Sequence, residues 1–334
     1  MTEPALSPPA AELPPSLDLL VVGDCNPDVL VVGGDVTPAF GQQEKLVDSI
    51  SLVVGASAAI TAVAAARLGL RVGLAAAIGD DPAGEFMLAQ LAAAGVDCSA
   101  VAMRRGVATG MTVALSRGSD RAILTALGAM PTLTAADIPD ALLSRTRHVH
   151  VSSYFLLQRT LGPGLAGLLA AARRAGAGTS LDTNWDPAER WTDDQLRGVL
   201  AHVDLLLPNE AEAMLLSGQP DLPHAAAALT ATGLRLAVKR GADGALCADG
   251  AAQPVPVAAP ALPAGEVVDT TGAGDCFNAG LIAGLLRGLD LPAAARLGCA
   301  VATLSTRAAG GTAAAPELAE ALSVAGRLGA AGPL

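Results

Sequence analysis

The chain has 334 residues, a length that accommodates one large α/β domain or two smaller ones. Hydrophobic residues make up 51% of it and aromatic residues only 2%, so a sizeable core must be built from Ala, Leu and Val. The formal net charge of −11 leaves no basic stripe for nucleic acid or an anionic membrane, and we expect neither partner. A phosphorylated ligand is not excluded, because it needs only local positive charge.

The chain also lacks the usual signs of export. No apolar segment of about 18 residues runs without a charge, and no basic region precedes an apolar core at the N-terminus. The five cysteines are scattered and show no Cys-x-x-Cys spacing, so we expect reduced thiols rather than disulfides or a metal site. Residues 1–16 carry five prolines and are predicted to form a disordered tail. The expected location is cytoplasmic.

From Leu17 onward, short apolar runs alternate with helical patterns. The expected strands are 19–22, 72–78, 148–151, 179–182, 203–207 and 236–238, and the expected helices are 57–68, 84–94, 165–175, 193–201, 210–216 and 225–232. Continuous apolar runs suit strands that are buried on both faces. The alternation therefore predicts an α/β fold with a doubly wound, mostly parallel sheet covered by helices on both faces.

Two segments interrupt this alternation with hairpin-like pairs of strands. The first pair is 29–33 with 46–54, and the second is 109–115 with 121–126, turning at Arg117-Gly118-Ser119-Asp120. These strands form either a separate small sheet or the edges of the main sheet. The residues alone leave both arrangements open.

The stretch Asp269-Thr270-Thr271-Gly272-Ala273-Gly274-Asp275-Cys276-Phe277-Asn278-Ala279-Gly280 carries the most chemical information. Its glycine-rich turn opens a predicted buried helix, so backbone N–H groups and the positive end of the helix dipole meet there and can bind an anion. Asp275 is placed to take a proton from a nucleophile that attacks phosphorus. The alternative is a helix cap worth about 1 kcal/mol.

Asn26 and Asp28 lie just beyond the first strand, in Gly23-Asp24-Cys25-Asn26-Pro27-Asp28. Ligands of open α/β sheets bind beyond the carboxyl ends of the strands, where an amide and a carboxylate can bind vicinal hydroxyls. The alternative is a polar turn built on Asn-Pro.

Two further motifs follow buried strands. Asn209 and Glu212 open a helix three residues apart and so share one face, although an ordinary N-cap explains them equally well. Asp182 and Asn184, at the end of another strand, allow the same argument. Lys239-Arg240-Gly241-Ala242-Asp243-Gly244 has a simple β-turn as its alternative, with Gly244 supplying a positive φ.

The twelve residues from Asp269 to Gly280 resemble the C-terminal signature of the ribokinase-like (PfkB) family of carbohydrate and nucleoside kinases, and the resemblance covers about residues 17–318. It implies that Asp275 is the catalytic base and that Gly272, Ala273 and Gly274 form the anion hole. It also implies a kinase domain over 17–328, with a small β-sheet lid from about 29–54 and 109–126 that covers the sugar and forms a homodimer contact.

The resemblance assigns further roles. The implied substrate ligands are Asn26, Asp28 and Gly55, and the implied nucleotide ligands are Asn209, Lys239, Gly241, Gly244 and Gly274. Glu212 and Asp182 are implied to hold Mg²⁺, partly through water, and Asp269 and Thr271 to lie near a monovalent cation such as K⁺. The implied cofactors are therefore ATP and Mg²⁺, with K⁺ as an addition, and Gly310-Gly311-Thr312 is implied to close the adenine pocket.

The N-terminal signature departs from the family pattern Gly-Gly-x-x-x-Asn-x-Ala. The chain has Gly55-Ala56-Ser57-Ala58-Ala59-Ile60-Thr61-Ala62, with Ala56 for the second glycine and Ile60 for the asparagine. The lost asparagine weakens any assignment of a substrate. It also motivates an alternative, a non-catalytic sugar-binding regulator that keeps the fold.

Other enzyme classes lack their motifs. There is no Gly-x-x-x-x-Gly-Lys-Ser/Thr loop, and no Gly-x-Gly-x-x-Gly after the first strand, which disfavours a dinucleotide oxidoreductase. His148 and His150 alternate in a strand and are predicted to be structural. We expect ATP-dependent phosphorylation of a hydroxyl on a small, unphosphorylated sugar or sugar acid. A nucleoside is the alternative substrate, and the candidates to stack on its base are Phe40, Tyr154 and Phe155. A phosphosugar would need a cation at the pocket, which Lys45, Arg104 or Arg121 could supply.

Overall fold

The computed structural model describes residues 17–117, 120–250, 252–263 and 265–330, so the predicted tail and the centre of the 117–120 turn lie outside the described residues. The main sheet contains β1 (Leu19–Val22), β4 (Val72–Gly79), β5 (Asp97–Arg104), β8 (His148–Val151), β9 (Gly178–Leu181), β10 (Leu205–Leu206), β11 (Arg235–Lys239), β12 (Ala245–Asp249) and β13 (Val255–Val257). Its order is β13-β12-β11-β10-β9-β8-β1-β4-β5.

The strands from β5 to β11 are parallel, and β12 and β13 are added antiparallel at one edge. Leu19 and Val21 of β1 enter one core, and Leu20 and Val22 enter the core on the opposite face. A strand that is buried on both faces must be apolar at every position, as β1 is. The predicted doubly wound α/β fold is confirmed.

Helices cover both faces of this sheet. One face carries α1 (Ser57–Arg67), α2 (Pro82–Ala93), α9 (Ala273–Leu286), α10 (Leu291–Ser305) and α11 (Leu318–Ala330). The other carries α3 (Asp140–Leu143), α4 (Tyr154–Leu157), α5 (Gly162–Arg174), α6 (Asp194–Leu200), α7 (Glu210–Ser217) and α8 (Leu222–Thr230). Short 3₁₀ turns occur at η1 (Met130–Thr132), η2 (Ala135–Asp137) and η3 (Gly241–Asp243).

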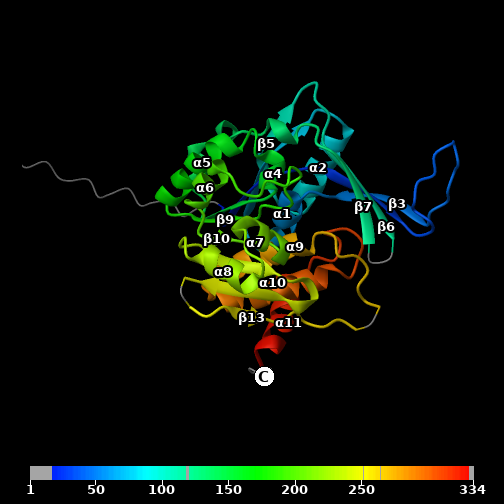
Figure 1. Cartoon of the computed structure of the whole chain (residues 1–334). Helices are drawn as coiled ribbons and strands as arrows, with labels where there is room; N and C mark the ends of the chain where they lie inside the picture. The colour runs from blue at the N-terminus through cyan, green and yellow to red at the C-terminus, as the bar shows by residue number, and fades with distance from the viewer. Residues whose placement is uncertain (1–16, 118–119, 251, 264, 331–334) are drawn as a thin grey trace, which may run out of the picture.

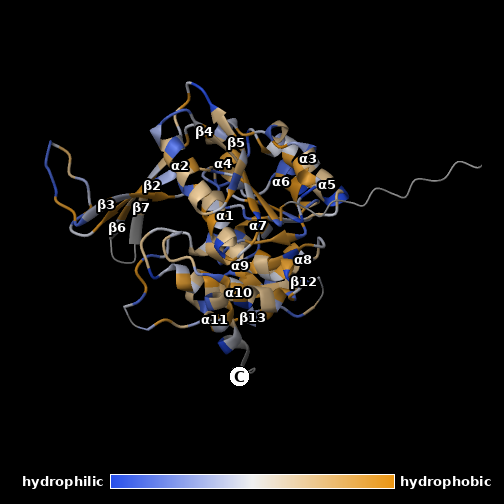
Figure 2. Cartoon of the chain, turned by 180° about the vertical axis from the view of Figure 1, so that it is seen from behind, coloured by the Kyte–Doolittle hydropathy of each residue, from blue (hydrophilic) through white to orange (hydrophobic). Residues whose placement is uncertain are grey.

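A separate four-stranded sheet has the order β3-β2-β6-β7, with β2 (Pro27–Val32), β3 (Ser49–Val54), β6 (Met111–Arg117) and β7 (Asp120–Ala126). It stands out from the body of the molecule in both Figure 1 and Figure 2. Both predicted hairpin pairs are antiparallel, and β2 joins them by pairing in parallel with β6. The alternative that they are edges of the main sheet is therefore wrong. The strand expected over 46–54 begins only at Ser49.

Three strands of the main sheet, β5, β12 and β13, were not predicted. Each lies at or next to an edge, where partly exposed positions break the apolar run that marks a central strand. None of the described helices is long and apolar enough to cross a membrane. The five cysteines are free, as expected.

A buried polar chain crosses β8 and β9. Nε2 of His148 and Nδ1 of His150 each lie 2.8 Å from Oγ of Ser180, and Oγ of Ser152 lies 3.0 Å from Nε2 of His150. Burial lowers the pKa of His148 to about 4 and that of His150 to about 3, so both rings are neutral at pH 7. Their partners inside the sheet give both histidines a structural role.

Candidate active site

The predicted residues gather at the carboxyl end of the main sheet. The chain leaves β1 toward β4 on one side, whereas β8 and β9 lie on the other, so the order of the strands reverses between β1 and β8. Such a switch point opens a crevice in which α/β proteins bind ligands. Oγ of Ser153, after β8, donates to Oδ2 of Asp24, after β1, at 2.8 Å and joins the two sides.

The glycine-rich turn opens α9 as predicted. Gly272 caps this helix with a φ of 71°, a left-handed conformation that favours glycine. The N–H of Ala273 donates to the carbonyl of Thr270 at 3.2 Å, so it already has an acceptor within the turn. Gly274 and Asp275 follow in the first turn, where N–H groups have no intrahelical acceptor. Of the three predicted donors, Gly274 is therefore the one whose position in the first turn leaves its N–H available to a ligand, and the anion hole stays a prediction.

Lys239 lies beside this turn. A Cβ built on Gly274 would be 3.7 Å from Nζ of Lys239, so the ammonium group lies next to the helix N-terminus. The same group forms a buried ion pair with Asp182. Nδ2 of Asn278, on α9, also donates to Asp182 at 2.6 Å. Residues from β9, β11 and α9 thus meet at one point.

The electrostatics of this cluster set the protonation of Asp275. Burial raises the pKa of Asp275 well above its ordinary value, the charge of Asp182 raises it further, and Lys239 opposes the rise. Burial alone would lower the pKa of Lys239, but Asp182, Glu212 and Asp275 hold it above its ordinary value. A carboxylate with a raised pKa beside an ammonium group is suited to act as a general base.

Asn209 and Glu212 form a reciprocal cap at the start of α7. Oδ1 of Asn209 accepts from the N–H of Glu212 at 2.8 Å, and Oε2 of Glu212 accepts from the N–H of Asn209 at 2.9 Å. The cap foreseen as the alternative is therefore present, and it commits the side chain of Asn209. Burial, and then the charge of Asp182, raise the pKa of Glu212.

The residues expected to bind substrate lie together. Nδ2 of Asn26 donates to Oδ1 of Asp28 at 3.4 Å and to Oγ1 of Thr112, on β6, at 3.2 Å. A Cβ on Gly55 would be 1.9 Å from Oδ1 of Asp28, so a side chain at position 55 would displace the Asp28 carboxylate. The small sheet thus supplies a polar cluster of amide, carboxylate and hydroxyl groups to the site.

The glycines after β11 have local structural roles. Gly244 has a φ of 84°, and a Cβ there would be 2.0 Å from the carbonyl oxygen of Val257. The turn with a positive φ at Gly244, which was the alternative interpretation of this segment, is therefore present. Glycine is also needed at position 244 because the chain at the end of β13 passes so close to it. Gly241 has a φ of 57° and opens η3, where a Cβ would meet no other atom within 4 Å.

The loop after α10 packs against the turn. Asp269 accepts from N and Oγ1 of Thr271 at 2.9 and 2.7 Å, and from N of Gly310 at 2.8 Å. Ile60 explains one departure from the family signature, because its side chain fills the space between Gly272 and Gly311. An apolar contact holds the turn where the signature has an asparagine.

The structure changes the list of candidate substrate-binding side chains. Tyr154 and Phe155 are buried, and Phe40 is 95% exposed on the loop between β2 and β3, so none of the three expected aromatic residues is placed as a stacking platform in the crevice. Trp185, which the sequence reasoning passed over, follows β9 and is 51% exposed. Lys45 pairs with Asp35 and Arg104 with Asp137; the side chain of Arg121 is not described.

Sequence reasoning also missed Asp24, Ser57 and Asn278. Asp24 accepts from the N–H of Ala58 at 2.9 Å, in addition to Ser153, and so fixes the start of α1. Its signal was a carboxylate directly after a buried strand, within the motif that drew attention to Asn26 and Asp28. Ser57 and Asn278 lie inside quoted motifs, but only the fold shows which side chains they contact.

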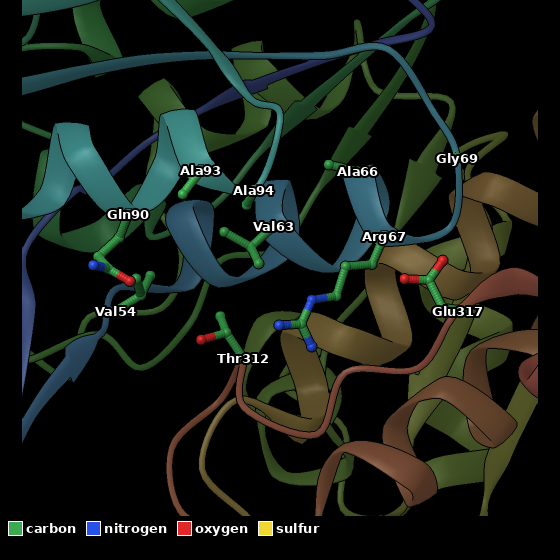
Figure 3. Close-up of a pocket in the computed structure, with 10 residues that line it drawn as sticks. All are labelled: Val54, Val63, Ala66, Arg67, Gly69, Gln90, Ala93, Ala94, Thr312 and Glu317. Carbon is green, nitrogen blue, oxygen red and sulfur yellow. The ribbon is translucent and has the colours of Figure 1, made fainter.

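A cavity of about 460 Å³ lies elsewhere, between α1, α2 and the loop after Gly311 (Figure 3). Thr312 in its lining belongs to the loop that was implied to close the adenine pocket, whereas Arg67, Gln90 and Glu317 were not predicted as site residues. Nη1 of Arg67 donates to the carbonyl of Ala315 at 2.8 Å. The convergence of side chains at Asp275, rather than this cavity, marks the candidate site. No group of three or more His, Cys, Asp or Glu side chains suited to a metal occurs within the described ranges.

Comparisons with known proteins agree with this geometry. The model of the pfkB family carbohydrate kinases matches residues 16–318. A cytidine kinase of Thermococcus kodakarensis is 30% identical over 285 residues, which cover 84% of this chain and 93% of the relative. A ribokinase of Bacillus subtilis is 30% identical over 288 residues, covering 86% and 92%.

Solved structures show the same fold. A PfkB protein from Polaromonas has a TM-score of 0.75 at 29% identity, covering 91% of this chain and 98% of its own. A ribokinase from Arabidopsis thaliana has a TM-score of 0.77 at 22% identity, covering 93% and 99%. The chain belongs to the pfkB family of carbohydrate kinases and is a phosphotransferase with an alcohol group as acceptor.

Proposed function

We propose that the chain transfers the γ-phosphoryl group of ATP to a hydroxyl of a small, unphosphorylated sugar or sugar-like molecule. One observation carries the proposal: the carboxylate of Asp275, with its raised pKa, lies at the N-terminus of a buried helix beside the ammonium group of Lys239. The relatives support it, because the Arabidopsis ribokinase was solved with ribose and ATP.

In this mechanism Asp275 takes the proton of the acceptor hydroxyl as its oxygen attacks the phosphorus. The N–H groups that begin at Gly274 and the ammonium group of Lys239 stabilise the charge that develops on the phosphoryl oxygens. Loss of one such donor typically costs about 3 kcal/mol in the barrier. We also propose that Asn209, Gly241 and Gly244 bind the nucleotide. The helix cap at Asn209 and the turn after β11 fix the positions of these residues.

The donor set fits a magnesium ion that keeps most of its waters. Glu212 and Asp182 offer the hard oxygen atoms that Mg²⁺ prefers, and they lie close enough that the charge of Asp182 raises the pKa of Glu212. Mg²⁺ needs few protein carboxylates when it binds together with phosphates. An Escherichia coli protein described as ribokinase II was solved with ATP and Mg²⁺. When bound, the ion would supply counter-charge to the phosphates, while Lys239 stays paired with Asp182. We also propose a K⁺ site near Asp269 and Thr271, whose side chains are adjacent.

The polar cluster supports an unphosphorylated acceptor. Asp28, Asn26 and Thr112 suit hydroxyl groups, and Lys45 and Arg104, two of the cations considered for a phosphosugar, are engaged in ion pairs elsewhere. A nucleoside is the second candidate, favoured by exposed Trp185 and by the cytidine kinase relative. In either case the small sheet would act as a lid over the acceptor, within one kinase domain over 17–328.

We propose a homodimer through the lid. Strand registers place Val29, Val31, Ile50, Leu52, Val113, Leu115, Ala122 and Leu124 on one face of the small sheet, opposite the face that carries Asp28. Ile50 and Leu124 are each 66% exposed on this outer face. An aliphatic face is complementary to a second copy of itself, as a two-fold dimer requires. A cytoplasmic location is proposed on the basis of the five free cysteines.

The test is ADP release from Mg-ATP across sugars, sugar acids, sugar phosphates and nucleosides, with Asp275→Asn as the blank. We expect a substrate-dependent signal that the variant lacks, while the variant still binds ATP and the acceptor in calorimetry. Equal turnover by the variant would remove Asp275 from the mechanism. Acceptor binding without turnover by either protein would support the sugar-binding regulator instead.

A further inference from the structure

The side chain of Asn278 is buried in α9 and directs its amide nitrogen at Asp182. Nδ2 of Asn278 donates to Oδ2 of Asp182 at 2.6 Å, and the ammonium group of Lys239 pairs with the same oxygen. An ionised carboxylate only accepts hydrogen bonds, so the nitrogen of the amide, and not its oxygen, must face Asp182. The contact therefore determines which way the amide points.

This orientation leaves the other end of the amide without a partner. Oδ1 of Asn278 is buried and has no hydrogen-bond partner among the described residues. The other buried residues of α9 are apolar residues, glycines and a cysteine. A leucine would suit these surroundings better, because an unpaired buried acceptor destabilises a fold. The asparagine is therefore explained by the bond that its nitrogen makes and not by packing.

Asp182 is held on both of its carboxylate oxygens. Oδ2 accepts from Asn278 and Lys239, and Oδ1 accepts from the N–H of Asn184 at 3.3 Å. Asp182 is 2% exposed, so bulk water does not replace a donor that is lost. Without the amide of Asn278, Lys239 would be the one remaining side-chain donor to Oδ2 among the described residues.

The contact also links Lys239 to the helix at whose N-terminus it lies. Asn278 and Asp275 are three residues apart on α9 and so share one side of this helix. Asn278 fixes Asp182 relative to α9, and Asp182 holds the ammonium group of Lys239. That group lies next to Gly274, in the first turn of the same helix. The place of the ammonium group beside the glycine-rich turn therefore depends on the amide of Asn278.

We propose that Asn278 is a positioning residue, which holds the Asp182 carboxylate so that the ammonium group of Lys239 stays beside the glycine-rich turn. This proposal rests on the proposed kinase function, in which that group faces the phosphoryl oxygens of ATP. Asn278 is fully buried and contacts neither substrate itself. Its loss should weaken binding of the phosphates and slow phosphoryl transfer, and leave the acceptor cluster at Asn26 and Asp28 unchanged.

Binding of an ATP analogue tests this role without an acceptor. Asn278→Leu keeps the approximate size of the side chain and removes its donor. In calorimetry, the Kd of the β,γ-imido analogue of ATP should rise about 10-fold, and the Kd of AMP should stay within about twofold of the parent. AMP lacks the β- and γ-phosphates. The titrations are made in EDTA, so that a change in magnesium binding at Asp182 does not contribute.

The variant Lys239→Met/Asp182→Asn shows whether Asn278 acts through the ion pair. Neither charge remains in this background, so adding Asn278→Leu should leave the Kd of the analogue unchanged. A further loss as large as in the parent would overturn the proposal, as would an unchanged Kd in Asn278→Leu alone or an equal loss for AMP. Thr230→Val is the matched control, because it removes a buried hydroxyl in α8 that donates to the carbonyl of Ala226 at 2.8 Å. It should keep the Kd of the parent.

Turnover gives a second readout. With an acceptor identified by ADP release, Asn278→Leu should lower kcat about 10-fold or more and keep the KM of the acceptor within about threefold. A loss that appears only in the KM of the acceptor would place Asn278 in the acceptor site and overturn the proposal. Thr230→Val should keep the full rate, although it also loses a buried hydrogen bond.

A third measurement holds even if the protein binds no nucleotide. A double-mutant cycle on the free energy of unfolding combines Asn278→Leu with Asp182→Asn. A hydrogen bond to a charged carboxylate is stronger than one to an amide, so Asn278→Leu should destabilise the parent more than it destabilises Asp182→Asn. Equal losses would show that Asn278 does not hold Asp182. Unequal losses in a protein that binds no nucleotide would show that the contact stands and that the kinase function fails.

Discussion

Lys239 and Asp182 form a buried ion pair, although 57 residues separate them in the chain. Their side chains are 15% and 3% exposed, and they come from β11 and the end of β9, which are separated by β10 in the sheet. The pair brings a positive charge to the N-terminus of α9 that no single motif contains. A buried pair of this kind has consequences for stability as well as for catalysis.

Replacing Lys239 by Met should destabilise the fold by about 3–5 kcal/mol, because the carboxylate of Asp182 would remain buried without its counter-charge. The double variant Lys239→Met/Asp182→Asn should recover most of this loss, since neither charge remains. Asn278 can accept the new amide through Oδ1, which has no partner among the described residues. Urea unfolding measures all three proteins, and an equally unstable double variant would contradict the pairing argument.

The raised pKa of Asp275 predicts a conflict between activity and stability. The folded state keeps this proton to a higher pH than the unfolded chain, so stability falls as pH rises from 3.8 through the folded pKa. Asp275→Asn should therefore be inactive but more stable than the parent at pH 8. The difference between the two proteins should shrink toward pH 4; a less stable variant at pH 8 would argue against a desolvated carboxylate.

The titration of Asp275 should also appear in the pH profile of activity, as a fall in rate on the acidic side. Asp275 must be deprotonated to act as a base, so kcat/KM should rise with pH through a pKa above the usual carboxyl range. The charge of Asp24 contributes to this rise in the pKa of Asp275. Asp24→Asn keeps an oxygen for the N–H of Ala58 and should shift the limb to lower pH. An unchanged limb would show that Asp24 and Asp275 are not coupled.

Ala56 is a strained position that glycine should relieve. Its φ of 67° and ψ of 132° are rarely adopted by residues with a Cβ. Strain of this kind destabilises the folded state by about 1–3 kcal/mol, and glycine would remove it. Glycine also stabilises the unfolded chain by about 0.5–1 kcal/mol through its greater conformational freedom, which offsets part of this gain. Ala56→Gly should thus stabilise the fold by about 1 kcal/mol in urea unfolding. Ala89→Gly, at an exposed position of α2, should destabilise by about 1 kcal/mol and serves as the control.

The buried histidines predict loss of stability in acid. An unfolded chain protonates histidine below about pH 6.5, whereas folded His150 stays neutral until about pH 3. Stability should fall by about 1.4 kcal/mol per pH unit for this group as the pH drops from 6.5. His150→Gln keeps polar atoms for Ser180 and Ser152 and should reduce the slope.

The lid dimer is tested on two adjacent residues of β7. Leu124 lies on the outer aliphatic face and is 66% exposed, whereas Ile123 is 57% exposed on the face that carries Asp28. Leu124→Lys should convert a dimer to a monomer in light scattering, because a buried lysine without a partner is costly. Ile123→Lys should remain a dimer. A parent protein that is monomeric would end the proposal.

The position of the residues predicted to bind substrate was predicted correctly, although their role stays a prediction. Asn26, Asp28 and Gly55 were expected together and are together, because all three lie at the ends of neighbouring elements in the first quarter of the fold. The glycine turn before α9 was also located correctly. The bond from the N–H of Ala273 to the carbonyl of Thr270 could not be predicted, because residue types do not reveal which N–H groups a turn uses. The anion-binding role of the turn stays a prediction.

The alternation of apolar runs, the two hairpins and the glycine turn at Gly272 were determined by the sequence itself, because they depend on periodicity and turn chemistry over a few residues. Contacts between distant segments were decided only by the tertiary structure. Lys239 pairs with Asp182, and Ile60 fills the gap between Gly272 and Gly311, because strand order and helix packing place them there. The same packing buries Tyr154 and leaves Trp185 exposed, since burial depends on which helix covers a residue and not on its type.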